Sequence, residues 1–585
     1  MRKTGISPKT EKKPFGALRF FGKAIAFPLR PCYNRDYCIL KSDVLSRKET
    51  DMILPIVKCD TLCGTAHPIP THITYTYESG NASARLGAEA FASFSDATAA
   101  DSDAFVRFGL DEGLEDRAEI YRVTVSCDHI TVGFRDARGA VNGAATVALL
   151  LRKEDLREGE ILDYPSCDYR SLMIDMARGL PKEEDVLNVV KYMALAKYNR
   201  LHLHLSDSEG PCYRSEVHPE YRFLGKGEDC DKELLRRIDA LCRTYAIEII
   251  PEIEIPAHAS ALCKAHPEFK CQVENADPWA LCPGNEDVYP FFDALIREVV
   301  ALFPDSRYLH IGTDELEFTD LKPPYLCHWE ECPRCAALRE REGLKDKREE
   351  FYYVVNRVHE IVRKYGKRMI LWNDQIDVSK DVPISRDILV QFWRIAGKGR
   401  GPREGCTFER FLELGFEVVN AYYPETYFDL EDYMTEEKMK TWTPFRIPEQ
   451  DAKYAKQILG GEACAWEFGN YEEYPFYGYV TPPVAAIFSD KLWGLGERSF
   501  DAAYRQALAE FVFGDASLAQ IFDCIGGLIP PRKRARFTYL APEDLHPDVL
   551  HAMQARLDTC THCPSLEAYR LLLARIAETA TGHPQ

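Results

Sequence analysis

The chain has 585 residues, well above the roughly 250 to 300 at which one hydrophobic core stops growing, so about two to four domains are expected. Its composition, with 46% hydrophobic, 28% charged and 11% aromatic residues, excludes wholesale disorder and a fibrous repeat. The formal net charge of -19 argues against nucleic acid or an anionic membrane as a partner, because both require clustered positive charge.

Residues 1–52 show no sustained hydrophobic periodicity and carry many basic and turn residues, so a flexible or loosely packed extension is predicted there. The apolar stretch in this segment is broken by Arg19, Lys23 and Arg30 and lacks the continuous core of a secretory signal. No run of about 20 apolar residues occurs in the sequence, so no membrane span is expected. The 20 cysteines are scattered singly, which favours reduced thiols and a cytoplasmic location.

Residues 53–167 are predicted to form an α+β domain. Two β-rich runs, 120-IYRVTVS-126 and 129-HITVGF-134, precede 139-GAVNGAATVALLLRK-153, whose apolar spacing suits an amphipathic helix. This segment carries no obvious chemistry of its own.

Over residues 168–497, short β-type runs alternate with helical stretches, which is typical of parallel βα units. The eight runs are 171-SLMIDMA-177, 200-RLHLHL-205, 246-AIEIIPE-252, 307-RYLHIG-312, 368-RMILWN-373, 388-ILVQFW-393, 416-FEVVNAYY-423 and 458-ILGGEACAW-466. Residues 182–197 have the acidic first turn and apolar spacing of a crossover helix. The pattern predicts a (β/α)8 TIM barrel. An open doubly wound sheet is the alternative, although 175-DMARGLP-181 is not its Gly-rich phosphate turn. Residues 498–585 have a helical pattern and are predicted to form a helical C-terminal region.

Catalytic groups of a TIM barrel lie at the C-terminal ends of its strands. The predicted ends carry Asp175, Arg178, His204, Asp207, Glu252, His258, Asp314, Glu315, Trp372, Asp374, Trp393, Tyr427, Asp429, Trp466 and Glu467. Aromatic rings cover the apolar face of a pyranose and carboxylates bind its hydroxyls, so this set favours a sugar site. A hydrolytic metal site is the rival interpretation, and its candidate ligands are His202, His204, Glu252, His258 and His310.

The segment 307-RYLHIGTDELEF-318 resembles a signature of glycoside hydrolase family 20, the β-N-acetylhexosaminidases. Other segments resemble that family in order and spacing: 169-YRSLMIDMARGLPKEEDVLNVVKYMALAKYNRLHLHLSDSEG-210, 248-EIIPEIEIPAHASAL-262, 371-LWND-374, 391-QFW-393, 427-YFD-429 and 460-GGEACAW-466. The α+β unit is similar to the family's non-catalytic domain, so the resemblance covers about residues 55 to 495.

The resemblance implies an exo-acting, retaining enzyme that removes terminal N-acetylglucosamine or N-acetylgalactosamine by substrate-assisted catalysis. The carbonyl oxygen of the sugar's 2-acetamido group attacks the anomeric carbon and forms an oxazolinium ion. Glu315 would protonate the leaving oxygen and then activate water, while Asp314 stays ionised and orients the acetamido N–H. Adjacent residues leaving a strand are expected to point in different directions, which suits this route better than a facing acid and nucleophile.

The resemblance also implies roles for the other strand-end residues. Those that would bind the sugar are Arg178 and Asp429 at its hydroxyls, Tyr427 at the acetamido carbonyl, Trp372, Trp393 and Trp466 around the acetamido group and the ring, and Glu467, which stands one position before the family's Glu for the 4- and 6-hydroxyls. Those that would support the acid are Asp207, Glu252 and His258. No metal or organic cofactor is implied. The expected partner is an aminosugar-containing glycan, and the sequence gives no sign of oligomeric state.

Three departures from the family pattern concern specificity. Thr313 stands where the family usually has Gly, 466-WEF-468 places Glu467 one position early, and 207-DSEGPCY-213 lacks the usual aromatic after its glycine. These departures keep open a catalytically silent N-acetyl-sugar-binding protein, and a metal-dependent TIM-barrel hydrolase is the third hypothesis. The configuration of the sugar, its linkage and any sulfation stay undecided.

Two CxxC sequences raise the question of a structural metal. Cys327, His328 and 332-CPRC-335 lie in one loop, and 560-CTHC-563 lies near the C-terminus. Closing a zinc site within the first loop would need an unusual ligand spacing, so coincidental reduced thiols are favoured over zinc.

Overall fold

The structure is a computed structural model, and residues 48–585 form one compact unit within it. It describes residues 52–585 apart from Ser102, His562 and the segments 226–228, 317–322, 396–405, 429–432, 447–448, 467–479, 525–526, 530–546 and 581–585. The extension predicted over residues 1–52 therefore lies outside the described residues, except for Met52. Since the rest is a single compact unit, the domain boundaries at 167 and 497 stay predictions.

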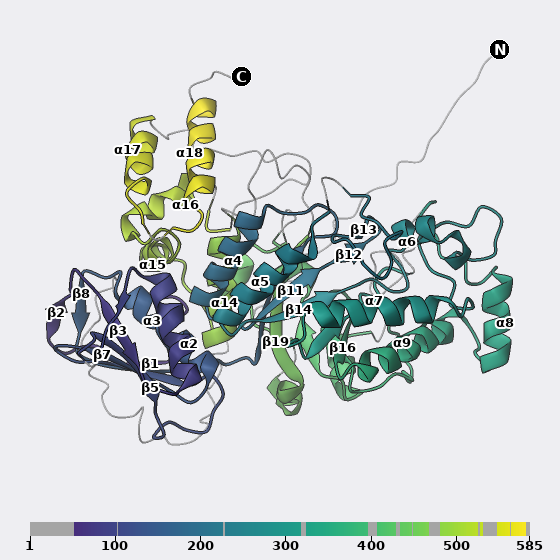
Figure 1. The fold of residues 1–585 in the computed structure, drawn as a ribbon, viewed down its shortest axis with the longest axis horizontal. Coiled ribbons are helices and arrows are strands. Elements are labelled where there is room, and N and C mark those ends of the chain that lie inside the picture. Colours follow the sequence, from purple (N-terminus) through teal and green to yellow (C-terminus); the bar gives the residue numbers. More distant parts are fainter. Residues whose placement is uncertain are drawn as a thin grey trace, which may run out of the picture. The chain divides into compact units, whose positions relative to one another are not determined.

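A seven-stranded sheet precedes the barrel, with the strand order β1-β9-β6-β7-β5-β3-β4. Its strands are β1 (Cys59–Asp60), β3 (Thr74–Tyr77), β4 (Thr98–Ala99), β5 (Val106–Leu110), β6 (Tyr121–Val125), β7 (Ile130–Phe134) and β9 (Gly159–Asp163), and β2 (Ala66–Pro68) pairs separately with β8 (Asp155–Arg157). Helices α2 (Ala82–Phe94) and α3 (Ala137–Leu150) pack against each other and against this sheet (Figure 1). Burial alternates along β6, as expected for a strand with one face on the core.

Eight parallel strands then close into a barrel, in chain order. They are β10 (Tyr169–Asp175), β11 (Arg200–His204), β14 (Glu248–Glu252), β15 (Tyr308–His310), β16 (Arg368–Trp372), β17 (Leu389–Phe392), β18 (Val418–Asn420) and β19 (Ile458–Ala465). The last strand pairs with the first, Tyr169 opposite Gly460, which closes the ring. All eight predicted runs overlap a barrel strand, and the strands close into a ring, so the TIM barrel is confirmed and the open sheet is wrong.

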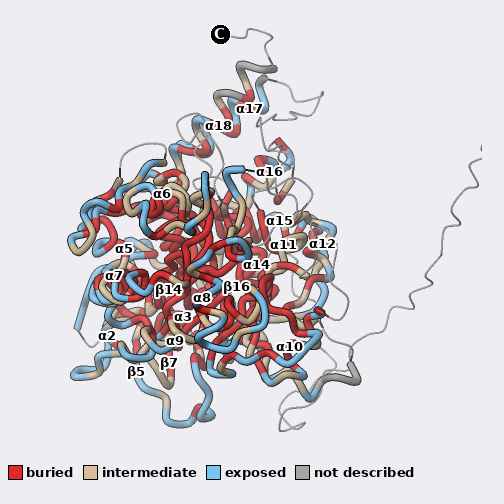
Figure 2. The backbone as a smooth tube through the Cα atoms, turned by 90° about the vertical axis from the view of Figure 1, so that its right-hand side faces the viewer, coloured by how far each residue is buried: buried red, intermediate tan, exposed pale blue. Residues whose placement is uncertain are grey.

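Helices connect and cover the strands. The longer ones are α4 (Glu183–Leu195), α5 (Lys232–Thr244), α7 (Val288–Leu302), α9 (Lys347–Lys364) and α14 (Thr481–Gly494). Shorter elements in the loops are β12 (Ser206–Asp207), β13 (Gly210–Pro211), α6 (Ser260–Ala265), η2 (Pro267–Phe269), α8 (Pro333–Glu342), α10 (Phe408–Glu413), α11 (Tyr423–Thr426), α12 (Glu436–Thr441) and η3 (Glu449–Gln457). After the barrel come α15 (Ala502–Phe513), η4 (Ala516–Ala519), α16 (Gln520–Cys524), α17 (Pro547–Leu557) and α18 (Leu566–Ala580). Buried residues fill the centre, and exposed ones lie on the outer helices and loops (Figure 2).

The barrel interior is layered, because alternate side chains of each strand point inward. An apolar layer at the N-terminal end contains Tyr169, Ile250, Tyr308, Ile370, Leu389 and Val419. A polar layer follows, in which His202 Nδ1 lies 2.9 Å from Glu462 Oε1 and Gln391 donates to the same oxygen. Aromatic residues form the last layer, at the C-terminal ends. The site at the C-terminal ends of the strands therefore lies above two buried layers of side chains that fill the barrel.

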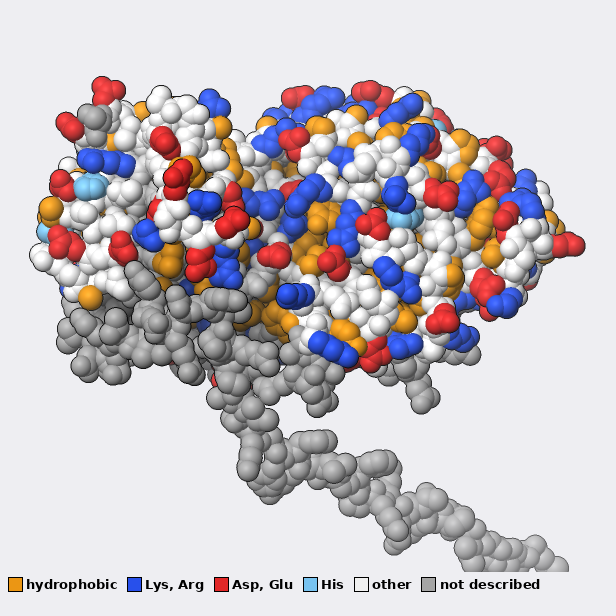
Figure 3. All heavy atoms as spheres, turned by 90° about the horizontal axis from the view of Figure 1, so that it is seen from below, with side chains coloured by type: hydrophobic (Ala, Val, Ile, Leu, Met, Phe, Trp, Pro, Cys, Tyr) orange, Lys and Arg blue, Asp and Glu red, His pale blue; other side chains and the backbone are white. Residues whose placement is uncertain are grey.

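Charged side chains of both signs lie on the surface (Figure 3). On the face drawn in Figure 3, Lys and Arg side chains are interspersed with Asp and Glu. Among the helices that the structure describes, none is both long and apolar enough to cross a membrane.

Candidate active site

Barrel closure brings together residues that are almost 300 positions apart in the sequence. Asp175 ends β10, and Trp466 directly follows β19, its neighbour in the closed barrel. The Arg178 guanidinium, three residues after β10, lies 5.1 Å from the centre of the Trp466 ring. The strand ends predicted from the sequence therefore meet at one mouth of the barrel.

The Asp314–Glu315 pair follows β15 on an unusual backbone. Gly312, Thr313 and Glu315 all have positive φ, at 63°, 81° and 52°. This conformation favours glycine and is strained for a β-branched residue such as Thr313. The Thr313 hydroxyl donates to the Trp372 carbonyl at 3.2 Å, which helps to hold it there. The position where the chain departs from the family pattern is thus one where glycine would fit the backbone.

His258 lies between the two carboxyl groups. Its Nε2 is 3.6 Å from Asp314 Oδ2 and 3.6 Å from Glu315 Oε2. The two side chains thus turn toward one imidazole, although neighbouring residues of a strand were expected to point apart. The expectation was wrong because the positive φ angles take residues 312–315 out of the strand conformation.

Burial sets the ionisation of this group. It raises the pKa of Asp314 to about 7, with His258 opposing and Asp374 and Glu315 reinforcing the rise. It also raises the pKa of Glu315, again against the attraction of His258. For His258, burial lowers the pKa, but Asp207 and Asp314 outweigh it and bring the pKa to about 9. The site therefore holds a cation beside two carboxyl groups that keep their protons to higher pH than usual.

Asp207 fixes both His258 and Arg178. Its Oδ1 lies 3.0 Å from His258 Nδ1, and its Oδ2 lies 2.6 Å from the Arg178 guanidinium. Arg178 also pairs with Asp175 at 3.0 Å. Burial raises the pKa of Asp207, but Arg178 and His258 outweigh burial and hold it well below the usual range. Asp207 and His258 are only 2% and 4% exposed, so little of either side chain is available to contact a ligand. Both are placed to hold the exposed residues of the site in position.

Glu252 organises the layer beneath. It accepts from Trp372 Nε1 at 2.7 Å and from His204 Nδ1, and His310 Nδ1 lies 2.8 Å from its Oε1. His202 Nε2 is 3.2 Å from its other oxygen. Three histidines of the rival metal hypothesis, His202, His204 and His310, thus lie around the Glu252 carboxylate. Their arrangement is that of a buried hydrogen-bond network that orients Trp372.

Aromatic rings line the mouth. The centroids of Trp372 and Trp466 are 5.8 Å apart, and those of Tyr427 and Trp466 are 5.9 Å apart. Trp393 stacks with Tyr427, with an interplanar angle of 7°. All four rings belong to, or pack against, one buried cluster. Asp429 and Glu467, the other two residues assigned to sugar binding, lie outside the described residues.

Two residues without an assigned role contact the Glu315 backbone, and a third interacts electrostatically with Asp314. Trp279 Nε1 donates to the Glu315 carbonyl at 3.0 Å, and its ring centroid is 4.4 Å from that of His258. Asp374 accepts from the Glu315 amide and from Trp393 Nε1, each at 3.0 Å. Glu254 is buried, and burial together with Asp314 raises its pKa well above the usual range. Asp374 was named among the strand ends without a role, Glu254 lies within a family-like segment and could have been found, and Trp279 carries no sequence signal.

Comparison with known proteins gives concordant results. The model of the glycosyl hydrolase family 20 catalytic domain matches residues 167–483. A beta-hexosaminidase of Vibrio furnissii is 28% identical over 427 residues, which are 65% of each chain. A beta-hexosaminidase of Akkermansia muciniphila is 30% identical over 282 residues, 43% of this chain and 55% of that protein. The chain spans 65%, 55% and 38% of the lengths of these two relatives and of one from Porphyromonas gingivalis.

Solved structures share the fold. A chitobiase of Flavobacterium johnsoniae superposes with a TM-score of 0.68 at 21% identity, covering 92% of this chain and 93% of its own. An exo beta-N-acetylglucosaminidase of Vibrio harveyi, solved with N-acetylglucosamine, gives 0.66 at 21% identity, covering 84% and 79%. Because the family model covers more than half of the sequence, from residue 167 to residue 483, the chain belongs to glycosyl hydrolase family 20.

Proposed function

We propose that the chain is an exo-acting, retaining β-N-acetylhexosaminidase that removes a terminal N-acetylated aminosugar by substrate-assisted catalysis. One observation carries the proposal: Asp314 and Glu315 share His258 at the end of β15, at the barrel mouth that the aromatic cluster lines. Family membership supplies the reaction class. The relatives from V. furnissii and A. muciniphila are both beta-hexosaminidases.

Glu315 is proposed as the general acid and base. Its side chain is 28% exposed, so it can reach a leaving group and then a water molecule. Its raised pKa, caused first by burial, favours the protonated form that the first step needs. The proton passes from Glu315 to the leaving oxygen, and the same carboxylate then takes a proton from the attacking water.

Asp314 is proposed to orient the acetamido N–H and to stabilise the positive charge that develops on the new ring. Its side chain is less exposed than that of Glu315, at 12%. Above pH 7 or so it is ionised, and His258 favours that form. The rings of Trp372, Trp393 and Trp466 would surround the acetamido group, with Tyr427 at its carbonyl. Arg178, whose side chain is 21% exposed, would bind hydroxyls.

The acid assignment is tested by comparing Glu315→Gln with wild type on two aryl N-acetyl-β-glucosaminides. A phenol of high pKa is the poorer leaving group and needs the proton most, so the variant should lose about 10²- to 10⁴-fold in kcat/KM on that substrate. An activated nitrophenol leaves without help, so its loss should be smaller. An equal, negligible loss on both substrates would refute the assignment.

Since both carboxyl groups turn toward His258, side-chain direction does not choose between substrate assistance and direct attack by Asp314. A series of substrates with mono-, di- and trifluorinated acetamido groups does. Fluorine weakens the carbonyl oxygen as a nucleophile, so kcat should fall steadily along the series. A rate independent of fluorination would favour attack by a protein carboxylate.

The sugar itself is tested by a panel of gluco, galacto and 6-sulfated N-acetyl glycosides. N-acetylglucosamine is the first expectation, because the V. harveyi enzyme was solved in complex with that sugar. Binding of N-acetylglucosamine without hydrolysis of any member would instead favour the silent sugar-binding protein.

A further inference from the structure

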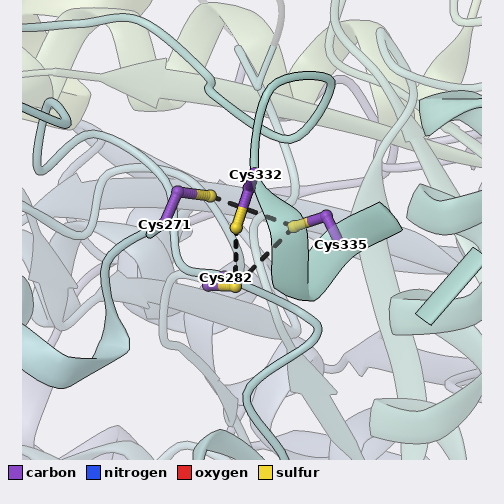
Figure 4. Close-up of side chains that lie close together, drawn as sticks. All are labelled: Cys271, Cys282, Cys332 and Cys335. Carbon is purple, nitrogen blue, oxygen red and sulfur yellow. Dashed lines mark hydrogen bonds between the residues drawn. The ribbon is translucent and has the colours of Figure 1, made fainter. Parts of the chain in front are cut away.

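Four buried cysteines from two separate parts of the chain meet beside the loops after β14 and β15. Cys271 and Cys282 lie in the segment after η2, and Cys332 and Cys335 lie at the start of α8. Their side chains point toward one another (Figure 4), and none is more than 6% exposed. Cys327 and His328, the neighbours considered in the sequence, are not part of this cluster.

The spacing of the sulfur atoms fits a tetrahedron around one metal ion. All four lie within 4.8 Å of one another. The distances that join Cys282 to Cys332, Cys282 to Cys335 and Cys271 to Cys335 are 3.7, 3.6 and 3.9 Å. With a zinc–sulfur distance of about 2.3 Å, the edge of a regular ZnS4 tetrahedron is about 3.8 Å. A disulfide, at about 2.05 Å, is excluded for these three pairs.

The backbone holds the two segments together independently of any metal. Trp329, fully buried, donates from Nε1 to the Leu281 carbonyl at 2.7 Å. The Gln272 amide donates to Cys332 Sγ at 3.2 Å, an interaction that favours a thiolate. A Cβ at Gly284 would lie 2.4 Å from the Arg334 carbonyl oxygen, so the loop passes directly against the CPRC turn. The four thiols are therefore pre-positioned.

We propose that Cys271, Cys282, Cys332 and Cys335 bind one structural zinc ion. Four cysteine sulfurs in tetrahedral arrangement select zinc or iron, and a closed set with no open position is typical of structural zinc. The four thiols lose four protons on binding, which leaves a net charge of -2 on the filled site. The N-terminus of α8, a helix of 10 residues, and the Gln272 amide face this charge favourably. Glu350, a carboxylate near Cys335, is itself paired with Arg339 at 2.7 Å.

The zinc site lies close in sequence to Trp279, so it would help to position Trp279 against the proposed catalytic residues. Trp279 lies three residues before Cys282, contacts the His258 ring and donates to the Glu315 carbonyl. Zinc would therefore fasten the loop that holds Trp279 to α8, which follows the loop that carries the acid. None of the four cysteines is a residue of the proposed chemistry, so the zinc is proposed to act on structure alone.

Metal analysis of the full chain tests the proposal. The protein is produced in zinc-supplemented medium and purified without chelators. We expect about one zinc per chain by mass spectrometry of the metal, and zinc-edge X-ray absorption should give four sulfur neighbours at about 2.3 Å. Cys282→Ser and Cys335→Ser should each lose the bound zinc. Cys242→Ser, a buried thiol of α5 outside the cluster, should retain it.

Several outcomes would overturn the proposal. They are zinc below about 0.1 per chain, iron in its place, or a zinc shell of nitrogen and oxygen. Equal zinc in Cys335→Ser and wild type would do the same. If the serine variants do not fold, the zinc content of the wild-type protein and the number of its sulfur neighbours still test the proposal. None of these measurements uses hydrolysis, so the zinc site can fail or hold independently of the proposed activity.

Discussion

Burial raises the pKa of the two residues on which the proposed chemistry depends, and His258 opposes that rise in both. The pKa of Asp314 is about 7, raised by burial against the attraction of His258. A carboxyl group with a raised pKa ionises above that pKa, so the proposed role of Asp314 should be lost as the pH falls through about 7. The proposed role of Glu315 needs its proton, which is lost as the pH rises through its own raised pKa. A bell-shaped profile is expected.

Replacing His258 by Gln should move the acid limb of kcat/KM to higher pH. The variant keeps a polar side chain but loses the cation that sits 3.6 Å from each carboxyl group. The measurement is kcat/KM against pH on a nitrophenyl substrate. Asp314→Asn serves as the control, because its residual activity should have no acid limb. A His258→Gln profile that overlays that of wild type would contradict this account.

At the residue scale, local motifs were enough to name the pair but not everything that holds it. Asp314, Glu315 and His258 lie in segments whose spacing carries a family pattern. Trp279 lies in no such segment, and its contact with Glu315 joins loops from two different strands. The direction of the two carboxyl groups was also missed, because positive φ at Thr313 cannot be inferred from a residue that normally avoids it.

The element that decides the site is the turn at the end of β15. Gly312 has a φ of 63°, and a Cβ built on it would lie 1.8 Å from Oε2 of the buried Glu254. Two separate effects therefore demand glycine: the backbone conformation and the packing of Glu254. Because Thr313 and Glu315 share the same turn, a shift at Gly312 would displace the acid as well.

Gly312→Ala should destabilise the protein and lower kcat together. Gly366→Ala is the matched control, because Gly366 has a similar φ of 69° but no atom within 4 Å of a built Cβ. The control should lose only the conformational part, about 1 kcal/mol, while Gly312→Ala should lose a further 1 to 3 kcal/mol, roughly, from overpacking. Thermal midpoints and kcat for the two variants measure the difference. Equal losses would show that Glu254 moves aside freely.

At the element scale, the barrel strands were predictable and the loop contacts were not. Each strand is a short buried β run, and a closed parallel barrel leaves such runs visible in the sequence. The cysteine cluster joins Cys271 and Cys282 to residues 50 or more positions later. Only the folded loops bring these together, so the CPRC sequence by itself suggested the wrong partners.

Across the whole molecule, buried charges connect the seven-stranded sheet, the barrel and α14. Asp163, in β9, accepts from Tyr121 at 2.6 Å, from Lys197 at 3.0 Å and from Trp493 of α14 at 2.9 Å. Lys197, which precedes β11, is 1% exposed. The sequence indicated the sheet and the barrel as units, but a lysine before a strand gave no sign that it would be buried between them.

Lys197→Met should destabilise the whole compact unit without changing its chemistry. Removing one partner of a buried ion pair leaves the other charge uncompensated, which costs about 3 to 5 kcal/mol. Lys345→Met is the control: Lys345 pairs with Glu349 at 2.9 Å, but its side chain is 83% exposed, so its loss should leave the unfolding midpoint almost unchanged. Thermal unfolding of both variants tests the difference, and kcat measured well below the unfolding transition should match wild type in both.

Because Asp163 also binds residues of the sheet and of α14, we expect the lower midpoint of Lys197→Met to be seen equally by probes in the sheet and in the barrel. A loss confined to one of them would mean that the two unfold separately and that this network does not couple them.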